Sequence, residues 1–510
     1  MTTDAPSRLE GAAAGLVSGA LAVGVGMLVA AITDVVSPID AVGSEVIDRA
    51  PLWLKELAIR WFGTDDKLAL RIGIITLLAV AAAALGMAAR RRAWIGWTGF
   101  GVFGLIGALA AAHRPGESVG AAVPSVLGAL VGGWVLQRAL RPRPIEVPGP
   151  SQVPLGWDRR RFLVTGGATA VAAAAAAGVA TALEGKRVDD LREAAAAPLP
   201  SASPTGLVNE IPSGATVDPS IPFITPTGDF YRIDTALSFP RVDLKKWRVD
   251  IKGMVDTPLS FSYDELLAMP QEERVVTLCC VSNEVGGEYV GNAVWQGVML
   301  RDVLDRAGVQ PGAEQVFSTS LDGWTCGFPV EAALDGRDAM LVVGMNGSTL
   351  PLEHGYPVRL VVPGLYGYVS ATKWLEKIEL TTWDRQGYWV PRGWSRLGPI
   401  KTQSRIDVPR ANAKVAAGPQ KIAGVAWAQH TGILSVEVRV DDGEWQQARL
   451  ATDVSDDAWR QWVLDWDAPA GEHRITVRAT DKTGATQTED RAPVAPDGAT
   501  GWHAIRVKVS

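Results

Sequence analysis

Five long runs of apolar residues lie in the first 183 residues of the chain, and none of them contains a charged residue. The runs occupy positions 11–32, 72–89, 93–112, 119–136 and 162–183. Each run is long enough to cross a bilayer as an α-helix, and one alone could still be a buried helix of a water-soluble core. Five together predict a transmembrane helical bundle, in which frequent Gly and Ala let helix backbones approach closely.

Residues 50–63, between the first two runs, have the sequence APLWLKELAIRWFG. At the period of an α-helix, apolar residues such as Leu57 and Trp61 lie opposite charged residues such as Lys55. This segment is too short and too polar to cross a membrane. It predicts an amphipathic helix that lies on the membrane surface in contact with lipid.

The charged residues between the runs predict an orientation in the membrane. The basic residues after the second and fourth runs are Arg90, Arg91, Arg92, Arg138, Arg141 and Arg143, and the acidic residues after the first are Asp34, Asp40, Glu45, Asp48, Asp65 and Asp66. Loops rich in Lys and Arg stay on the cytoplasmic side. We therefore predict a cytoplasmic N-terminus, a fifth span that runs outward, and an extracytoplasmic domain after Ala195.

The fifth run is preceded by an arginine-rich stretch, DRRRFL, from Asp158 to Leu163. It resembles the twin-arginine export signal, in which a polar residue and two arginines precede one further residue and Phe-Leu. Three arginines would also satisfy an ordinary positive flank. The Ala-rich run favours the export signal, which predicts the twin-arginine machinery as a partner. Because that machinery carries folded proteins, we expect the downstream domain to hold a cofactor.

The hydrophobic pattern changes after residues 194–206, whose sequence AAAAPLPSASPTG is typical of a linker. Apolar residues then alternate in short stretches bounded by Gly and Pro, which predicts strands, with short helices at 263–268 and 302–307. From about Lys421 the pattern is all-β, with turn sequences such as DDG and KTG between the strands. This spacing predicts an immunoglobulin-like sandwich.

Composition excludes some classes of function. The chain has 510 residues and a formal net charge of −6, which argues against a nucleic-acid partner. Its three cysteines cannot form a disulfide framework, and no CxxC spacing indicates a zinc site. Cys279 and Cys280 are adjacent at the end of an apolar stretch, and Cys326 is the third. Buried cysteines are often only small apolar side chains, so the pair alone does not define a site.

Several separated stretches of the second half occur in a characteristic order. They are FYRIDTALSFPRVDLKKWRVDIKG, then TLCCVSNEVGG followed by AVWQGVMLRDVL, then DGWTCGFPVEAALDG and a segment containing EHGYPVR and YVSATKW. Together with the sandwich that follows, they make residues 216–510 resemble the sulfite oxidase family of molybdopterin oxidoreductases. The membrane half lies outside this resemblance.

The resemblance and the hydrophobic pattern together predict a multi-domain chain. It would contain an α-helical transmembrane bundle, an α+β catalytic domain of the sulfite oxidase type and an all-β immunoglobulin-like sandwich. The expected boundaries are 1–145 for a four-helix transmembrane domain, 146–190 for the export signal and fifth span, 191–215 for a linker, 216–405 for the catalytic domain and 406–510 for the sandwich. The resemblance implies a sandwich of the dimerisation type, through which a homodimer could form.

The resemblance implies a molybdenum–molybdopterin cofactor in which one protein thiolate joins two pterin sulfurs and oxo or water oxygens. A soft thiolate suits such a centre, and metal binding holds it deprotonated. The family's ligand precedes a Val/Ala-x-Asn stretch, which matches Cys280 followed by Val281, Ser282 and Asn283. Cys280 is therefore the expected metal ligand and catalytic residue. Cys279 and Cys326 are expected to be packing residues, although a disulfide between them stays an alternative.

The phosphate of the pterin needs cations and hydrogen-bond donors. By resemblance, His354, Arg359 and Lys373 supply them, whereas without the family match His354 would be an ordinary loop residue and Lys373 a solvated charge. The stretch Ala371–Lys373 would add backbone amides. The expected cofactor contacts are Asp229, Tyr231, Arg232, Ser282, Asn283, His354, Arg359, Ala371, Thr372 and Lys373.

The residues after Cys280 depart from the sulfite-oxidising pattern. Members that oxidise sulfite carry Gly-Asn-Arg-Arg there, and one arginine receives the sulfite anion. This chain has Ser282, Asn283, Glu284 and Val285 instead, so a cation is missing where an anion would lie. We expect oxygen-atom transfer on a small or protein-borne S-oxide or N-oxide, such as protein methionine sulfoxide. Oxidation of sulfite or of another sulfur compound is the alternative.

The positions of the histidines limit how this chain could receive or pass on electrons. Haem ligation in a membrane bundle usually needs paired histidines, and only His113 is near the predicted helices, so no haem is expected on this chain. The helices would be an anchor, or a docking site for a quinone or a separate cytochrome. A function of another class, a non-enzymatic cell-surface binding module, would leave Cys280, His354, Arg359 and Lys373 unexplained.

Overall fold

The computed structural model divides into two compact units. The first contains Met1–Leu191 and Thr235–Arg241, and the second contains Arg192–Asp234 and Val242–Ser510. The described residues are 6–62, 66–115, 117–141, 143–144, 155–156, 159–196, 198–201 and 211–510.

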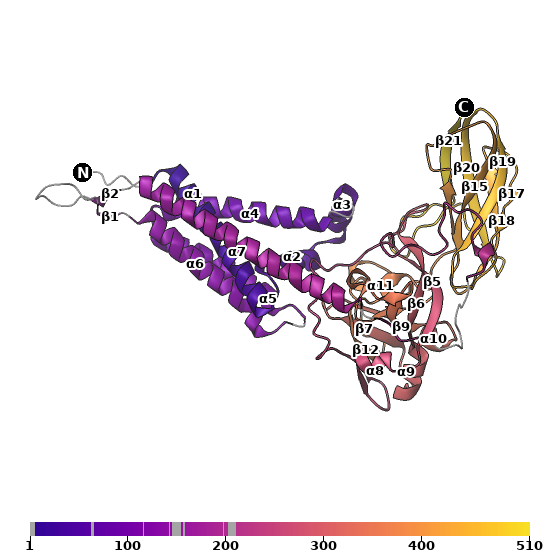
Figure 1. Ribbon diagram of the computed structural model, residues 1–510, viewed down its shortest axis with the longest axis horizontal. Coiled ribbons are helices and arrows are strands. Elements are labelled where there is room, and N and C mark those ends of the chain that lie inside the picture. The colour runs from indigo at the N-terminus through magenta and orange to yellow at the C-terminus, as the bar shows by residue number, and fades with distance from the viewer. Residues whose placement is uncertain are drawn as a thin grey trace, which may run out of the picture. The chain divides into compact units, whose positions relative to one another are not determined.

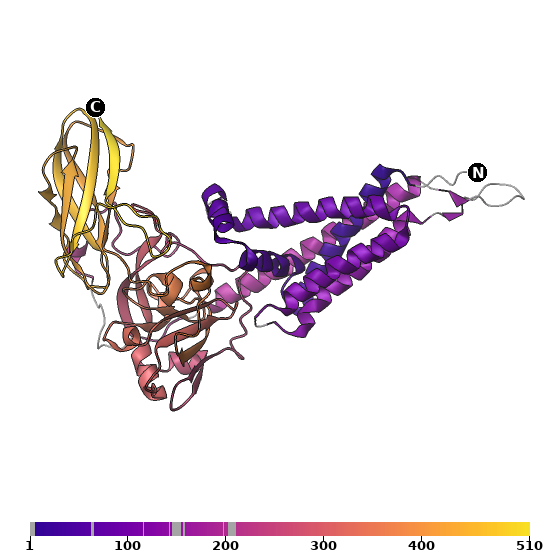
Figure 2. The ribbon, with the colours of Figure 1, turned by 180° about the vertical axis from the view of Figure 1, so that it is seen from behind.

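Among the described residues, five helices are long and apolar enough to cross a membrane, as the five apolar runs predict. They are α1 (Arg8–Thr33), α4 (Asp66–Ala89), α5 (Ala93–Ala112), α6 (Val123–Leu140) and α7 (Arg159–Ala194) (Figures 1 and 2). A short 3-10 helix, η2 (Val119–Ala122), leads into α6. Two short antiparallel strands, β1 (Arg143–Pro144) and β2 (Leu155–Gly156), lie between α6 and α7 in sequence.

The helices of the first unit approach one another at glycine. A Cβ atom on Gly15 of α1 would lie 2.0 Å from the carbonyl oxygen of Ala82 in α4. A Cβ atom on Gly128 of α6 would lie 2.4 Å from the carbonyl oxygen of Ala22 in α1. The backbones therefore leave no room for a side chain at these points, which is the packing expected of helices surrounded by lipid.

Two further helices, α2 (Pro38–Arg49) and α3 (Leu52–Phe62), lie between α1 and α4 in sequence. The helix predicted at 50–63 is α3, and its Trp61 side chain is 70% exposed. Residues 63–65, which include Asp65, lie outside the described part. We did not predict α2, although its start has a signal: Ser37 accepts a hydrogen bond from the Asp40 N–H, and Pro38 is the first helical residue.

Helix α7 continues past residue 183, where the apolar run ends. Most of the residues that follow, such as Leu191 and Arg192, are good helix formers, and Arg187 Nη2 lies 2.5 Å from Glu184 Oε1 within the same helix. The linker expected from residue 191 therefore begins after Ala194, and its positions 197 and 202–210 lie outside the described residues. So do Asp158 and the side chains of Arg159 and Arg161, while Arg160 is exposed.

Residues Thr235–Arg241 belong to the helical unit, although we expected them in the catalytic domain. Leu237 is 5% exposed. Arg241 forms ion pairs with Asp34 at 2.9 Å and with Glu117 at 3.5 Å. These charges come from separate parts of the chain, so no local sequence pattern predicts the group.

The second unit begins with two five-stranded sheets. In the first, the order is β10-β9-β6-β5, and β11 also pairs with β9; in the second, it is β4-β3-β12-β7-β8. The first contains β5 (Glu272–Cys279), β6 (Val290–Met299), β9 (Met340–Met345), β10 (Ser348–Thr349) and β11 (Arg359–Val361). The second contains β3 (Arg248–Gly253), β4 (Leu259–Ser262), β7 (Gln315–Ser320), β8 (Thr325–Pro329) and β12 (Leu375–Thr381).

Short helices connect these strands and confirm the two that the sequence predicts. They are α8 (Tyr263–Leu267), α9 (Leu300–Ala307), α10 (Glu331–Leu334) and α11 (Gly367–Ser370), with 3-10 turns η3 (Ser213–Ala215), η4 (Leu352–His354) and η5 (Val390–Arg392). The helix expected at 263–268 is α8, which starts with a capping box between Ser262 and Glu265. The helix expected at 302–307 is α9.

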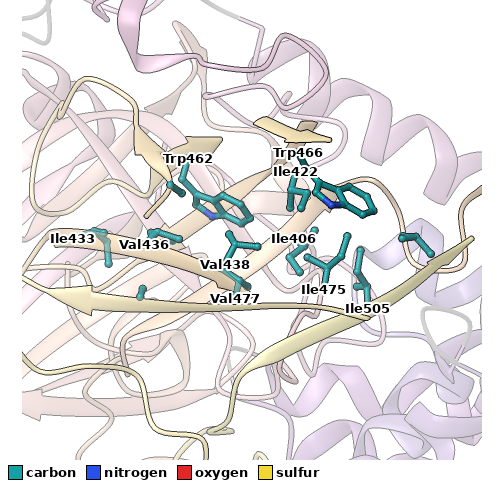
Figure 3. Close-up of a cluster of buried hydrophobic side chains, with 14 of the residues drawn as sticks. Ile406, Ile422, Ile433, Val436, Val438, Trp462, Trp466, Ile475, Val477 and Ile505 are labelled. Atoms are coloured by element: carbon teal, nitrogen blue, oxygen red, sulfur yellow. The ribbon is translucent and has the colours of Figure 1, made fainter. Parts of the chain in front are cut away.

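The remaining strands form two facing sheets, ordered β13-β15-β19-β18 and β14-β21-β20-β16-β17. The first contains β13 (Gln403–Val408), β15 (Gly418–Trp427), β18 (Arg449–Leu450) and β19 (Arg460–Ala468). The second contains β14 (Lys414–Val415), β16 (Ile433–Val440), β17 (Gln446–Gln447), β20 (Gly471–Asp481) and β21 (His503–Val509). Figure 3 shows Trp462 and Ile422 of the first sheet pointing toward Val438 and Ile475 of the second. This confirms a two-sheet sandwich, and its strands begin at Gln403 rather than 406.

Candidate active site

Cys280 lies directly after β5, and its side chain is buried. Its N–H donates to the carbonyl oxygen of Tyr289 at 2.9 Å, and the N–H of Ser282 donates to its sulfur at 3.4 Å. Burial raises the pKa of the Cys280 thiol, while the Ser282 hydrogen bond and the Lys373 charge act to lower it. A buried thiol held in this way forms a thiolate readily only when a positive centre such as a metal binds it.

The two adjacent cysteines have different surroundings. Burial raises the pKa of Cys279 well above its ordinary value, and the cation that acts against this is Arg405 rather than Lys373. Successive side chains of an extended segment point to opposite sides, which accounts for the difference. Cys326 lies 3.1 Å from Thr372 Oγ1 and 3.3 Å from Ser318 Oγ. All three thiols are free, so the alternative of a Cys279–Cys326 disulfide is not formed.

Three expected cofactor residues, His354, Arg359 and Lys373, are joined by hydrogen bonds through the backbone. His354 ends η4 and Arg359 begins β11, and Arg359 Nη1 donates to the His354 carbonyl oxygen at 3.1 Å. Lys373 Nζ donates to the Glu353 carbonyl oxygen at 3.0 Å and to Asp234 Oδ2 at 3.0 Å. The folded chain therefore brings together cations that are 14 positions apart in sequence, between Arg359 and Lys373.

Burial perturbs all three of these groups. It lowers the pKa of Lys373 to about 8 against the opposing effect of Asp234, and it lowers the pKa of Arg359 to about 10. Burial, Lys373 and Arg359 together lower the pKa of His354 to about 4, so this imidazole is neutral at pH 7. Asp234 pairs with Lys373, whereas Arg359 has no carboxylate partner among the described residues.

Of the three cofactor contacts expected before Thr235, one is half-buried and two are exposed. Tyr231 is half-buried, and burial together with Cys280 raises the pKa of its hydroxyl well above the ordinary value. The hydroxyl therefore stays protonated and can donate a hydrogen bond near the thiol. Asp229 and Arg232 are exposed, and Arg232 Nε lies 3.0 Å from Asp234 Oδ2.

The remaining expected residues surround Cys280 and α11. Asn283 is buried, and its Oδ1 accepts a hydrogen bond from the Tyr289 N–H at 2.8 Å. The Ala371 N–H already donates to the Gly367 carbonyl oxygen within the end of α11. We therefore expect any backbone amides offered to a cofactor to come from Thr372 and Lys373. The Thr372 hydroxyl is itself buried, 2.6 Å from Ser318 Oγ.

Sequence reasoning missed two residues of this site. Asp234 is the carboxylate that pairs with Lys373, and its side chain is only 6% exposed. Tyr366 is buried, and burial with the nearby Cys279 and Cys280 raises the pKa of its hydroxyl. A carboxylate two positions after Arg232 was the available signal for Asp234. Nothing in the sequence distinguishes Tyr366 from other core aromatic residues.

The arrangement fits an anionic cofactor. His354 Nδ1 is buried and has no hydrogen-bond partner among the described residues. An anion with acceptor oxygens would satisfy this nitrogen and balance the charge of Arg359, and the molybdopterin phosphate has both properties. Within the same described part of the chain, no three His, Cys, Asp or Glu side chains gather to hold a metal by themselves. A metal held mainly by a pterin needs only one protein thiolate.

Comparison with known proteins decides the family. Residues 236–389 match the family model of the oxidoreductase molybdopterin binding domain. Human mitochondrial sulfite oxidase is 30% identical over 340 residues, which cover 56% of this chain and 62% of that protein. The uncharacterised oxidoreductase YuiH of Bacillus subtilis (strain 168) is 35% identical over 156 residues, covering 31% of this chain and 76% of that protein. The chain belongs to the sulfite oxidase family of molybdopterin-dependent oxidoreductases.

The family match also locates the expected residues. Cys280, His354, Arg359 and Lys373 of this molybdopterin oxidoreductase all lie inside residues 236–389, whereas Asp229, Tyr231 and Arg232 precede them. The chain spans 62% of the length of human sulfite oxidase. Among solved structures, the sulfane dehydrogenase SoxCD of Paracoccus pantotrophus is 27% identical with a TM-score of 0.49, covering 56% of this chain and 81% of that chain.

Proposed function

We propose that this molybdopterin oxidoreductase is anchored in a membrane and transfers an oxygen atom on a neutral S-oxide or N-oxide outside the cytoplasm. Cys280 would be the single protein ligand of the metal. When bound, the cofactor supplies a metal centre that exchanges an oxygen atom and two electrons with the substrate.

The residues of this chain have separate roles in the proposal. His354, Arg359 and Lys373 would hold the anionic end of the cofactor. Arg359 is a buried cation, Lys373 is a cation whose side chain is 10% exposed, and His354 has a buried nitrogen with no partner among the described residues. The Ser282 N–H, 3.4 Å from the Cys280 sulfur, would orient the ligand and stabilise its thiolate. The Tyr231 hydroxyl stays protonated and could donate to an oxygen near the metal.

The proposal of a neutral substrate rests on the side chains at positions 284 and 285. Glu284 is exposed and Val285 is half-buried, so this part of the loop after Cys280 presents no cation. An anion such as sulfite would meet an apolar group and a carboxylate there. A neutral sulfoxide or N-oxide meets no such electrostatic cost.

The alternative within the same family is oxidation of sulfite or another sulfur compound, which similarity to sulfite oxidases favours. A purely non-enzymatic binding module is disfavoured by the family membership of residues 236–389. A homodimer through the sandwich, of the immunoglobulin-like type, belongs to the proposal, as does electron exchange with a quinone or a cytochrome. We still predict no haem on this chain.

The substrate class is tested on the purified full-length protein. Elemental analysis should find about one molybdenum per chain, and reduced viologen dye should be oxidised when methionine sulfoxide is added. Sulfite with an artificial acceptor should give poor turnover. Efficient, saturable sulfite oxidation at micromolar concentrations would instead restore the alternative.

The location outside the cytoplasm is tested through the arginine pair. Replacing Arg159 and Arg160 by Lys keeps the positive charge that sets helix topology but removes the pair that the export receptor distinguishes. Protease added to cells stripped of their wall should digest residues 196–510 in the wild type and spare them in the double variant. Equal digestion would mean that these arginines are only a positive flank.

A further inference from the structure

The loop at 284–288, immediately after the proposed metal ligand and its neighbours, is a tight turn. The Gly287 N–H donates to the Glu284 carbonyl oxygen at 2.8 Å, and Gly286 has a φ of +80°, a conformation that favours glycine. The loop contains Val285, which stands where the sulfite-oxidising pattern has its anion-binding arginine. Its position therefore decides what a substrate meets beside Cys280.

Arg405, a residue of the sandwich strand β13, binds this loop from outside the catalytic sheets. Its Nη1 donates to the Gly287 carbonyl oxygen at 2.9 Å. Its Nε donates to Asp407 Oδ1 at 2.7 Å, and its side chain is 15% exposed. Because the ion pair with Asp407 fixes the guanidinium, the hydrogen bond to the loop has a defined position.

His503, the first residue of β21, packs against the same loop. A Cβ atom on Gly286 would lie 2.2 Å from His503 Cδ2, so the imidazole ring lies directly on the Gly286 backbone. The Ile406 N–H donates to His503 Nδ1 at 3.0 Å, which places the ring proton on Nε2. Burial lowers the pKa of His503 to about 4, so the ring stays neutral at pH 7 and this contact keeps one form.

The two contacts come from different sheets of the sandwich, because β13 and β21 belong to different layers. Hydrogen bonds also link the two ends of this loop to Cys280, the proposed metal ligand. Asn283 Oδ1 accepts a hydrogen bond from the Tyr289 N–H, and the Tyr289 carbonyl oxygen accepts one from the Cys280 N–H. Hydrogen bonds and packing contacts thus connect the sandwich, through the turn, to the backbone of Cys280.

We propose that Arg405 and His503 are positioning residues, through which the sandwich sets the place of the 284–288 loop on the substrate side of Cys280. The sandwich would then affect substrate binding, in addition to the homodimer formation proposed for it. This proposal rests on the proposed function, since it takes the loop to face the substrate.

The test compares Arg405→Ala, Arg405→Lys and His503→Ala with Arg449→Ala, an exposed arginine on β18 that serves as the matched control. Each full-length variant is assayed for hydrogen exchange in residues 281–289, for molybdenum content and for kinetics with methionine sulfoxide. Arg405→Ala should speed exchange in the loop and raise KM by roughly tenfold, with molybdenum content and kcat less affected. Arg405→Lys should give a loop exchange rate and a KM between those of Arg405→Ala and the wild type. The control should match the wild type in both.

Unchanged loop exchange and unchanged KM in Arg405→Ala and His503→Ala would overturn the proposal. A second result would also overturn it. If Arg405→Lys and His503→Ala lost molybdenum and thermal stability but showed no separate rise in KM, the role of these residues would be purely structural. If the wild-type protein contained no molybdenum, the proposed function would fall. The hydrogen-exchange comparison would still decide whether the sandwich holds the loop.

Discussion

In the helical unit the helix backbones approach one another closely at glycine, whereas in the sandwich large side chains such as Trp462 and Trp466 fill the space between two sheets. Gly15 and Gly128 have no room for a Cβ atom, while Trp462 is fully buried. Both regions are rich in apolar residues, so hydrophobicity alone does not distinguish how they pack.

The membrane location that we propose for the helices would explain this difference. Lipid tails are as apolar as the helix surface, so helices in a membrane gain by close van der Waals contact rather than by leaving the solvent. Strands in water gain by removing large apolar areas from it. We therefore expect the helical unit to be sensitive where residues are smallest, and the sandwich to be sensitive where they are largest.

The largest effect is expected from Gly15→Leu in α1. The new side chain would collide with the backbone of α4 at Ala82, so the bundle should not assemble. Gly73→Leu is the matched control, because a Cβ atom at Gly73 in α4 meets nothing within 4 Å. The yield of monodisperse full-length protein extracted in detergent should collapse for the first variant only. Equal yields for both would show that glycine contacts do not organise the bundle.

The next effect separates chemistry from packing in the second unit. Cys280→Ser should abolish molybdenum binding and turnover, while the free energy of unfolding of the cofactor-free protein changes by less than about 1 kcal/mol. Elemental analysis, dye-linked activity and thermal unfolding measure the three quantities. A fully loaded and active Cys280→Ser protein would mean that another group is the ligand.

A smaller but still large effect is expected in the core of the sandwich. Trp462→Ala leaves a cavity between the sheets and should destabilise the protein by about 3–5 kcal/mol. Leu434→Ala, at a side chain 56% exposed on β16, should cost less than about 0.5 kcal/mol. Calorimetry of the full-length variants compares the two. A similar loss of stability for both would contradict a core built on large side chains.

The smallest effect is expected from Cys279→Ser. The residue is 2% exposed, and we expect it to have no metal role. The substitution should therefore cost about 1–2 kcal/mol and leave molybdenum content unchanged. The measurement is the same calorimetry and elemental analysis as for Cys280→Ser. Loss of metal from this variant with a retained metal in Cys280→Ser would reverse the assignment of the two thiols.

The sequence predicted features that depend on local pattern and left out those that depend on tertiary contact. Charge-free runs and alternating strands predicted the five apolar helices and the sandwich strands, because period and length are local properties. Helix α2 was missed because its acidic residues were interpreted as a loop, although the Ser37 and Pro38 start signal was present. The end of α7 was misplaced because an apolar run and a helix need not end together.

The candidate site shows the same division. Cys280, His354, Arg359 and Lys373 were chosen from motifs, and the fold brings the three cofactor-binding candidates together by hydrogen bonds. Asp234 was not chosen, because its role depends on Lys373, which is far away in sequence. The inclusion of Thr235–Arg241 in the helical unit could not be predicted either, since its ion pairs join distant segments.

The glycine contacts of α1 also constrain the order in which the protein can be made. Helix α1 is synthesised before its partners: it contacts α4 at Gly15 and α6 at Gly128, and a Cβ atom on its Gly24 would lie 2.7 Å from the Ala173 carbonyl oxygen of α7. In the membrane location that we propose, α1 must therefore wait in the insertion machinery or in lipid with its glycine surface uncovered until these partners are made. Translation has passed the arginine stretch at 159–161 before the last of these contacts can close. Completion of the bundle and presentation of the proposed export signal would therefore belong to the same late stage of synthesis.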